Sequence, residues 1–445
     1  VSHWQFRQGA VTDPVWRESI ARLVRLAGSA VLPVYFKGMN SLQFHLLGML
    51  HPRLRTLQLP RELLRQMGRD VEVRVGSLVS RKSLADIPTD RDAIHYLRWR
   101  TYLLANRGEP ARRLVPKLPA VKLPTRTRPA VAEETRREAL VEELATLRPD
   151  QKIDESGEYC TYVTTLQQTP NILREIGRLR ELSFRQAGEG SGKELDLDLY
   201  DSYYQHLFLW HNTRQEIVGA YRLVRVDRVQ RRLGSEGLYS ASLFRFDDEF
   251  FRRIGPAFEL GRSFVRPEYQ RQYAPLFGLW KGVAKLVARS PEAPVLFGAV
   301  SISDSYHPVS RRLMAAFLEF HEAHRELARF VRPRRRMGAA PRTHSDDETM
   351  AMVYEDLDSL TGPIADIEID GKGVPVLVRQ YLRMGGKLLG LTVDPSFSNT
   401  LDALILVDLR LTERGMLERY MSKPEAASFL AYHKLGEMVS RRIAS

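Results

Sequence analysis

The sequence predicts an α/β protein with a mixed sheet flanked by helices, and one stretch near its middle carries most of that prediction. The apolar run 258–265 is interrupted by a glutamate, a glycine and an arginine, which is typical of a strand with a bulge or a close backbone approach. After Pro267, apolar residues recur at three- and four-residue steps and predict a helix over 275–288. A second apolar run, 295–302, predicts a buried strand. Strand, helix and strand therefore follow one another as in α/β folds.

Further periodic segments lie on both sides of this stretch. The segments 205–210 and 216–226 are predicted to pair as strands, joined by a turn at 211–213. The other expected strands are 159–165 and 401–409, and the other expected helices are 133–147, 172–184, 310–330 and 374–384.

The composition limits the classes of protein to which the chain can belong. A formal charge of +13 and a pI near 9.8 favour anionic partners, namely acidic lipid headgroups, an acidic carrier protein or nucleic acid. The basic residues are dispersed among apolar segments without a helix-turn-helix, zinc or RNP signature, so we expect no nucleic-acid partner. The single cysteine, Cys160, excludes an internal disulfide and a CxxC metal site, and no metal ligand set is expected. No apolar run approaches the ~18 residues that span a bilayer, and no signal pattern is visible.

The chain divides by composition into three consecutive parts. Residues 1–108 alternate helical and strand patterns, as in a piece of an α/β domain. Residues 109–149 begin with prolines interspersed with basic residues, which favour a stiff extended spacer, and continue as a charged helix. The basic spacer suits an anionic membrane surface, and a solvated tether is the alternative interpretation. Residues 150–445 contain the central stretch.

The candidate site centres on Glu259, Arg262 and Arg222. In a regular strand Glu259 and Arg262 face opposite sides, and a bulge at the intervening glycine brings both to one face. Arg222 lies among apolar strand residues, and a buried unpaired charge is costly, so we expect it to pair with Asp198 or Asp201. A structural Glu–Arg pair is the alternative for the strand, and a solvated loop or helix cap is the alternative for the two aspartates.

A second group of basic residues surrounds the start of the helix predicted at 275–288. A helix N-terminus offers free N–H groups and the positive end of a dipole, which suit a phosphate group. Arg266, Arg271 and Lys281 are therefore candidate contacts to a phosphate-bearing donor, with plain solvation as the alternative.

Several motifs in fixed order resemble the ornithine-lipid N-acyltransferase group, a hemolysin-like offshoot of the GNAT fold that is related to acyl-homoserine-lactone synthases. The resemblance covers roughly residues 150–435. Its motifs are Leu197–Asp201, Val218–Leu223, Glu259-Leu-Gly-Arg-Ser263, Arg266-Pro-Glu-Tyr269, Leu279-Trp-Lys-Gly282, Leu296-Phe-Gly-Ala299, Val374–Gly386 and Asp394–Phe397.

This resemblance implies transfer of a (3-hydroxy) fatty acyl group to the α-amine of ornithine or a similar amino acid, giving a lyso-aminolipid. Such a reaction needs a deprotonated amine, a positioned thioester and stabilisation of the oxyanion. Glu259 is the expected general base, with Arg262 and Arg222 beside it. Asp198, Asp201 and Arg185 are expected to contact the substrate.

The donor implied by the resemblance is the phosphopantetheine thioester of acyl carrier protein. The segment 266–278 lacks the clustered glycines of a CoA pyrophosphate loop, which makes acyl-CoA the less favoured donor. An acidic carrier also suits the positive charge of the chain. The alternatives are an acyl-homoserine-lactone synthase and a non-catalytic membrane-associated scaffold.

A second resemblance covers residues 1–108. The segments Val31–Ser41, His51–Thr56 and Arg61–Leu64 resemble the C-terminal half of a lysophospholipid (PlsC-type) acyltransferase domain. That family's catalytic His-x4-Asp motif is not found in the sequence, so this part is expected to be incomplete and without O-acyltransferase activity. The whole arrangement resembles bifunctional ornithine-lipid acyltransferases. It implies a cytoplasmic protein, peripheral on the inner face of the cytoplasmic membrane.

Overall fold

The computed structural model describes residues 3–5, 10–38, 40–41, 43–45, 47, 51–68, 70–109, 129–338, 354 and 356–444. Most of the predicted proline-rich linker lies outside these ranges. The described residues form two compact units. The first combines those of 1–118, 306–317 and 339–374, and the second combines those of 119–305, 318–338 and 375–445. The first unit thus combines the N-terminal part of the chain with two segments from its C-terminal half, whereas the sequence predicts three consecutive parts. The predicted domain bounds 1–108, 109–149 and 150–445 stay a prediction.

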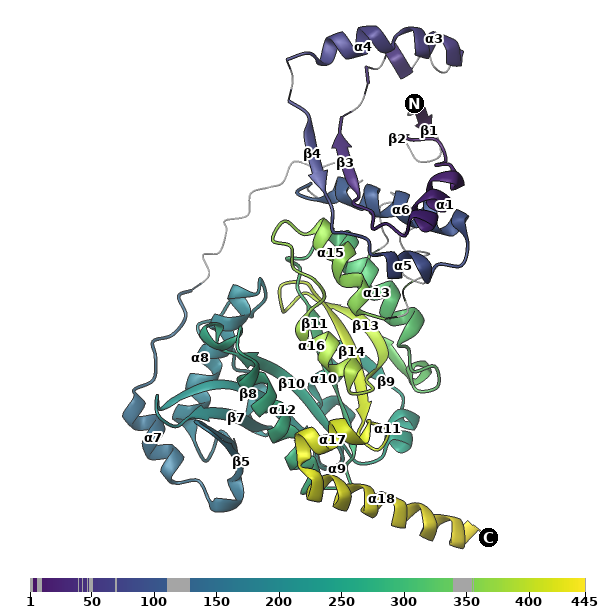
Figure 1. Ribbon diagram of the computed structural model, residues 1–445. Helices are drawn as coiled ribbons and strands as arrows, with labels where there is room; N and C mark the ends of the chain where they lie inside the picture. The colour runs from purple at the N-terminus through teal and green to yellow at the C-terminus, as the bar shows by residue number, and fades with distance from the viewer. Residues whose placement is uncertain are drawn as a thin grey trace. The chain divides into compact units, whose positions relative to one another are not determined.

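An eight-stranded mixed sheet forms the centre of the second unit (Figure 1). Neighbouring strands are antiparallel except β10 and β11, which are parallel and are connected by the helix α12 (Tyr273–Ala288). The strands predicted for this sheet are confirmed to within a residue at each end, whereas β5 and β13 were not predicted. In spatial order the strands are β13 (Lys387–Asp394), β14 (Thr400–Asp408), β11 (Val295–Ile302), β10 (Ala257–Val265), β8 (Glu216–Arg225), β7 (Gln205–His211), β6 (Tyr159–Thr164) and β5 (Lys152–Ser156).

The parallel strands β10 and β11 run side by side only at their start. Their register ends at Glu259 and Phe297. Beyond these residues β10 continues beside β8, and β11 continues beside β14. A Cβ built on Gly298 would lie 2.0 Å from the carbonyl oxygen of Leu260, so only glycine fits where the strands part. The two strands therefore separate toward their C-terminal ends.

Two long helices cover opposite faces of this sheet. Phe208 of β7 packs in a core cluster with Leu173 and Ile176 of α8 (Pro170–Gln186). The next residue, Leu209, lies against α12, where a Cβ on Gly278 would come within 3.0 Å of it. Because successive strand residues point to opposite faces, α8 and α12 lie on opposite sides.

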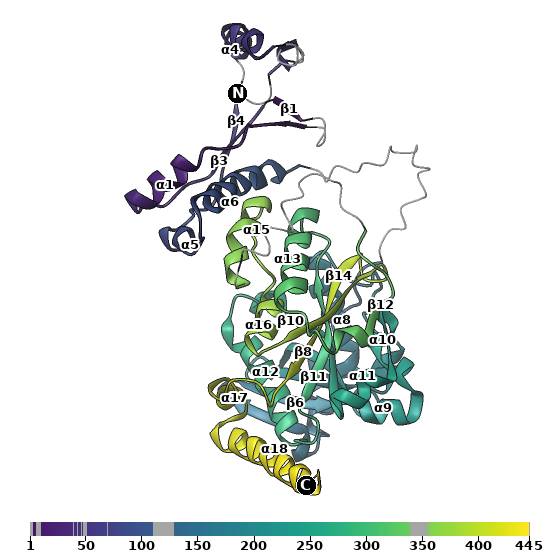
Figure 2. The same ribbon diagram turned by 90° about the vertical axis from the view of Figure 1, so that its right-hand side faces the viewer.

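Short elements between β8 and β10 complete the core, and the sequence did not predict them. They contribute Phe244 and Phe250 to a cluster that also contains Phe297 of β11. The helix expected at 310–330 begins at Pro308 and already ends at His321. The helices α17 and α18 lie side by side next to α12 (Figure 2). The remaining helices and strands that lie wholly or partly in this unit are α7 (Arg137–Ala145), α9 (Val226–Leu233), α10 (Tyr239–Leu243), β9 (Phe244–Phe246), α11 (Asp248–Ile254), α13 (Pro308–His321), β12 (Val331–Pro333), α16 (Val376–Arg383), α17 (Arg414–Met421) and α18 (Lys423–Ala444).

A buried ion pair joins distant segments of the first unit. Arg100 of α6 (Asp90–Leu103) lies 2.6 Å from Asp366 of α15 (Thr361–Ile367), and the two side chains are 4% and 2% exposed. The main-chain N–H of Ser77 also donates to Asp366. A charge buried this deeply needs its partner, so the pair holds α15 against α6. The other elements of this unit are β1 (His3–Gln5), β2 (Ala10–Thr12), α1 (Glu18–Ala27), β3 (Val34–Lys37), α3 (Pro52–Leu57), α4 (Leu59–Gln66), β4 (Glu72–Val75) and α5 (Arg81–Ala85).

Among the helices that the structure describes, none combines the length and the hydropathy that crossing a bilayer requires.

Replacing Gly298 with alanine should destabilise the fold by about 2 kcal/mol or more, because the new Cβ would meet main-chain atoms that cannot move aside. Gly261→Ala is the matched control on the neighbouring strand, since a Cβ there meets nothing within 4 Å. The midpoints of urea unfolding measure both effects. Equal midpoints for the two variants would contradict the close approach of the strands.

Candidate active site

Glu259 lies on the buried part of β10 and is held by hydrogen-bond donors on both carboxylate oxygens. The Tyr204 hydroxyl and the main-chain N–H of Tyr239 donate to Oε2, and the N–H of Ser240 donates to Oε1 at 2.6 Å. The side chain is 2% exposed. Burial and the Glu259 carboxylate raise the pKa of Tyr204 well above its usual range, so Tyr204 stays a donor. Glu259 therefore fixes the start of α10 and its tyrosine against the sheet.

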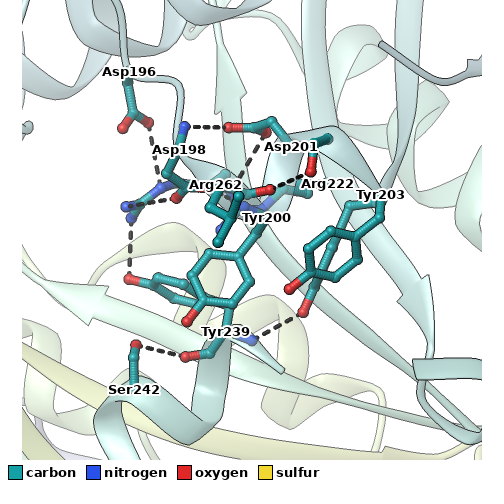
Figure 3. A network of polar contacts seen from close by, with 12 residues as sticks. Asp196, Asp198, Tyr200, Asp201, Tyr203, Arg222, Tyr239, Ser242 and Arg262 are labelled. Atoms are coloured by element: carbon teal, nitrogen blue, oxygen red, sulfur yellow. Dashed lines mark hydrogen bonds and ion pairs between the residues drawn. The ribbon is translucent and has the colours of Figure 1, made fainter. Parts of the chain in front are cut away.

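Arg222 of β8 lies on the same face of the sheet as Glu259. Glu259 pairs directly with Val224, and Arg222 stands two residues before Val224 on the same strand, so the three side chains share one face. Its Nη1 donates to Asp198 Oδ1 at 2.6 Å, which confirms the predicted pairing. The rings of Tyr200, Tyr204 and Tyr239 surround the guanidinium at 5.0–5.5 Å, within the range of cation–π attraction. Figure 3 shows Tyr200 and Tyr239 beside Arg222.

Arg262 reaches this face through a bulge in β10. The register with β8 shifts between Gly261 and Phe264, and Arg262 has φ +48°, in the left-handed region that side chains rarely adopt. The predicted bulge is thereby confirmed. Arg262 does not pair with Glu259 as a structural Glu–Arg pair would; its Nε lies 3.3 Å from Asp196 Oδ2 and its Nη1 donates to the Tyr239 hydroxyl at 3.2 Å (Figure 3).

Asp198 is the most exposed of the charged side chains in this network. It precedes the 3₁₀ turn η3 (Leu199–Ser202), and its side chain is 24% exposed, whereas Arg222 is 1% exposed. Its second oxygen lies 3.9 Å from Arg262 Nη2. Two guanidinium groups thus hold one partly open carboxylate.

Asp201 connects the network to α8 through its ion pair with Arg180. It lies 2.8 Å from Arg180, and Arg222 lies 3.4 Å away. Although burial raises it, these arginines hold the pKa of Asp201 well below its usual range. Burial and the nearby Arg180 lower the pKa of His206 to about 3, so His206 is neutral, and Arg180 Nη2 donates to its Nδ1 at 3.1 Å.

Two further carboxylates, those of Glu189 and Asp402, interact electrostatically with Arg262. Burial is the main cause that raises the pKa of Glu189 to about 8. The charge of Asp402 adds to this shift, and the charge of Arg262 opposes it. Burial likewise raises the pKa of Asp402, on β14, to about 6, with Asp394 of β13 adding to it. Both β13 and β14 lie beyond β11 in the sheet, so the site draws on strands from both sides of the separation.

The model of the Acetyltransferase (GNAT) domain matches residues 179–281. A glycine N(alpha)-acyltransferase of Bacteroides thetaiotaomicron is 34% identical over 261 residues, which cover 55% of this chain and 76% of the relative. The chain belongs to the GNAT N-acyltransferase family.

Two further relatives support this membership. A glycine N(alpha)-acyltransferase of Phocaeicola vulgatus is 40% identical over 171 residues, covering 36% of this chain and 52% of the relative. An L-ornithine N(alpha)-acyltransferase of Rhodobacter capsulatus is 28% identical over 279 residues, covering 60% of this chain and 96% of the relative. No solved structure matches the chain. The chain is thus an acyltransferase, and the predicted mixed sheet flanked by helices is confirmed.

The GNAT match spans all of the predicted site residues, and the structure brings one group of them together. Glu259, Arg262 and Arg222 meet around Tyr239, and Asp198 and Asp201 join them through the arginines. Their catalytic and binding roles stay a prediction.

The structure does not bring the remaining predicted residues into this network. Arg185 is occupied by Glu181 and by two main-chain carbonyl oxygens. Of the expected donor contacts of this acyltransferase, Arg266 pairs with Glu216 at 2.7 Å and Lys281 pairs with Asp154 at 2.9 Å. Arg271 is exposed in the turn before α12.

Sequence reasoning missed several members of the acyltransferase site. The tyrosines carry no spacing signal of their own, since the turn that follows Asp198 and the short helix α10 bring them together. Glu189 had a signal, because it stands between two glycines after a helix. The missed residues are Arg180, Glu189, Asp196, Tyr200, Tyr204, Tyr239, Asp394 and Asp402.

Acidification should destabilise the protein through His206. Its pKa is about 3 when folded and ~6.5 when unfolded, so between these values the unfolded chain binds more protons and stability falls as the pH falls. His206→Gln should reduce this slope by up to about 1.4 kcal/mol per pH unit. Urea unfolding at pH 7 and pH 4.5 measures it, with His95→Gln of the other compact unit as control. An unchanged slope in His206→Gln would show that His206 is not buried in its neutral form.

Proposed function

We propose that this chain transfers a fatty acyl group from the thioester of acyl carrier protein to the α-amine of an amino acid, giving an N-acyl amino acid (a lyso-aminolipid). The observation that carries the proposal is the pairing of Arg222 with the partly open Asp198. Arg222 Nη2 is buried without a hydrogen-bond partner among the described residues, and such a donor is costly to leave unpaired. A guanidinium donor beside an accessible carboxylate complements the carboxylate and ammonium groups of an amino acid.

The separation of β10 and β11 supports a thioester donor with an extended arm. Beyond Glu259 and Phe297 the facing edges of the two strands no longer pair with each other. Strand edges of this kind bind an extended chain through main-chain hydrogen bonds. The amides of a phosphopantetheine arm have the required donors and acceptors. Its thioester would then lie beside the bulge at Arg262.

The names of the relatives support glycine and ornithine as candidate acceptors. Those with 34% and 40% identity are named for glycine, and the one with 28% identity is named for ornithine. We therefore place glycine before ornithine as the acceptor to test first. These names also favour amino-acid acylation over lactone synthesis.

Purified protein with fatty acyl carrier protein should convert glycine or ornithine into an N-acyl product detected by mass spectrometry. Arg222→Lys should lower kcat/KM about 100-fold or more, because one ammonium cannot bridge Asp198 and Asp201 while offering a further donor. Arg231→Ala, at a side chain that is 72% exposed, is the control.

No acylated product with any amino acid, from folded wild-type protein and a loaded carrier, would overturn this function. Product from acyl-CoA at equal efficiency would overturn the choice of donor alone.

We further propose peripheral contact with an anionic membrane through α4. Its exposed apolar side chains include Leu63 and Leu64, at 74% and 66% exposure, beside the exposed basic residues Arg61 and Arg65. Apolar groups flanked by arginines suit the interface of an acidic bilayer. The resemblance of residues 1–108 to a lysophospholipid acyltransferase is consistent with contact to a membrane. That this part derives from such a domain is likewise a proposal.

Changing Leu63 and Leu64 together to glutamine should weaken binding to vesicles of phosphatidylglycerol and phosphatidylcholine about tenfold or more, because the apolar contact is lost. Sedimentation with the vesicles measures it. Leu411→Gln, at an exposed leucine of the other compact unit, is the control. Undiminished sedimentation of the double variant would exclude α4 as the contact.

A further inference from the structure

Glu189 stands on a short loop whose main chain is fixed on both sides. It lies between Gly188 and Gly190, which adopt φ +77° and +106°, a region that favours glycine. The hydroxyl groups of Ser303 and Ser398 donate to main-chain carbonyl oxygens on either side of Glu189, at 2.7 and 3.3 Å. These serines follow β11 and β13, so the loop is tied to the ends of the strands beyond the separation.

Asp402 lies beside this loop on β14 and is 2% exposed. Its Oδ1 accepts from Thr400 at 3.0 Å, and it pairs in register with Ser301 of β11. Arg262 interacts electrostatically with both Asp402 and Glu189. The same arginine contacts Tyr239 and Asp198, so the carboxylates share one guanidinium with the amino-acid site proposed above.

The charged and titratable groups that face the two carboxylates come from several elements. Asp394 of β13 and Tyr239 of α10 join Arg262 of β10 around Asp402. Burial and the charge of Asp402 raise the pKa of Glu189 to about 8, and burial and the charge of Asp394 raise the pKa of Asp402 to about 6. The pair therefore exchanges a proton close to neutral pH.

Glu259, the base expected from the sequence, is less suited to this task. Both of its oxygens already accept hydrogen bonds from Tyr204, Tyr239 and Ser240, and its side chain is only 2% exposed, so an ammonium group would have to displace one of these donors. Glu189 by contrast is only partly buried.

We propose that Glu189, supported by Asp402, accepts the proton that the acceptor's ammonium group must lose before it attacks the thioester. This inference rests on the proposed N-acylation. The ammonium N–H bond breaks and its proton passes to the Glu189 carboxylate. The amine then attacks the carbonyl carbon, the N–C bond forms, the C–S bond breaks, and a second nitrogen proton goes to the leaving thiolate. Glu189 later returns its proton to water. Asp402 is a positioning residue that keeps negative charge beside Glu189.

The test measures kcat between pH 6 and pH 9.5 with saturating fatty acyl carrier protein and glycine or ornithine. In the wild type, kcat should fall below a pH of about 8, because only ionised Glu189 accepts the proton. Glu189→Gln should lower kcat about 100-fold or more and remove that dependence. Glu189→Asp should recover part of the rate with a shifted profile. Asp402→Asn should move the Glu189 limb to lower pH, since a neighbouring negative charge is removed. Glu194→Gln, at an exposed residue of the same connection, should match the wild type.

Wild-type kcat and pH profile in Glu189→Gln would overturn the inference while leaving the N-acylation intact. An inactive wild type would instead refute the proposed function. If Glu189→Gln does not fold, the profile of Glu189→Asp decides: a shifted limb supports the role and an unchanged limb overturns it. Loss of activity in Glu259→Gln with an unchanged limb at pH 8 would also support Glu189 as the proton acceptor.

Discussion

The site depends on the sharing of Asp198 by two arginines from neighbouring strands. Arg222 comes from the regular part of β8, whereas Arg262 reaches Asp198 only because β10 bulges and one residue adopts a left-handed backbone conformation. Strain of this kind persists only where its surroundings enforce it. The aspartates and Tyr239 supply that enforcement here, since they pair with the guanidinium of Arg262.

The separation of β10 and β11 lies beside these charged groups and next to a well-packed core. The main chains of the two strands approach too closely at Gly298 for any side chain, and Phe297, the residue before it, packs in a core cluster with Phe244 and Phe250. The polar network then lies on one face and α12 on the other. A thioester arm between the strands and an amino acid at Asp198 would meet beside Arg262.

Much of the sheet was predictable, because the apolar runs of buried strands and the periodicity of helices can be recognised within a short stretch of sequence. The bulge and the Arg222–Asp198 pair also followed from residue chemistry, since a buried arginine needs a partner. The tyrosine cluster and the carboxylates of β13 and β14 did not. Asp402 sits far from Glu189 in sequence, and only the order of strands brings them together. Likewise Arg266 and Lys281, near α12, form ion pairs with residues far away in the sequence, which residue spacing does not reveal.

Recognition of a zwitterion by Arg222 and Asp198 is tested most directly by calorimetric binding of glycine and glycinamide to the protein. Glycinamide keeps the amine and lacks the carboxylate. If the free Nη2 of Arg222 binds the acceptor's carboxylate, glycinamide should bind at least about tenfold more weakly than glycine, and the preference should vanish in Arg222→Lys. The same comparison with ornithine and its amide covers the second acceptor. Equal affinity for acid and amide in both pairs would contradict this mode of recognition.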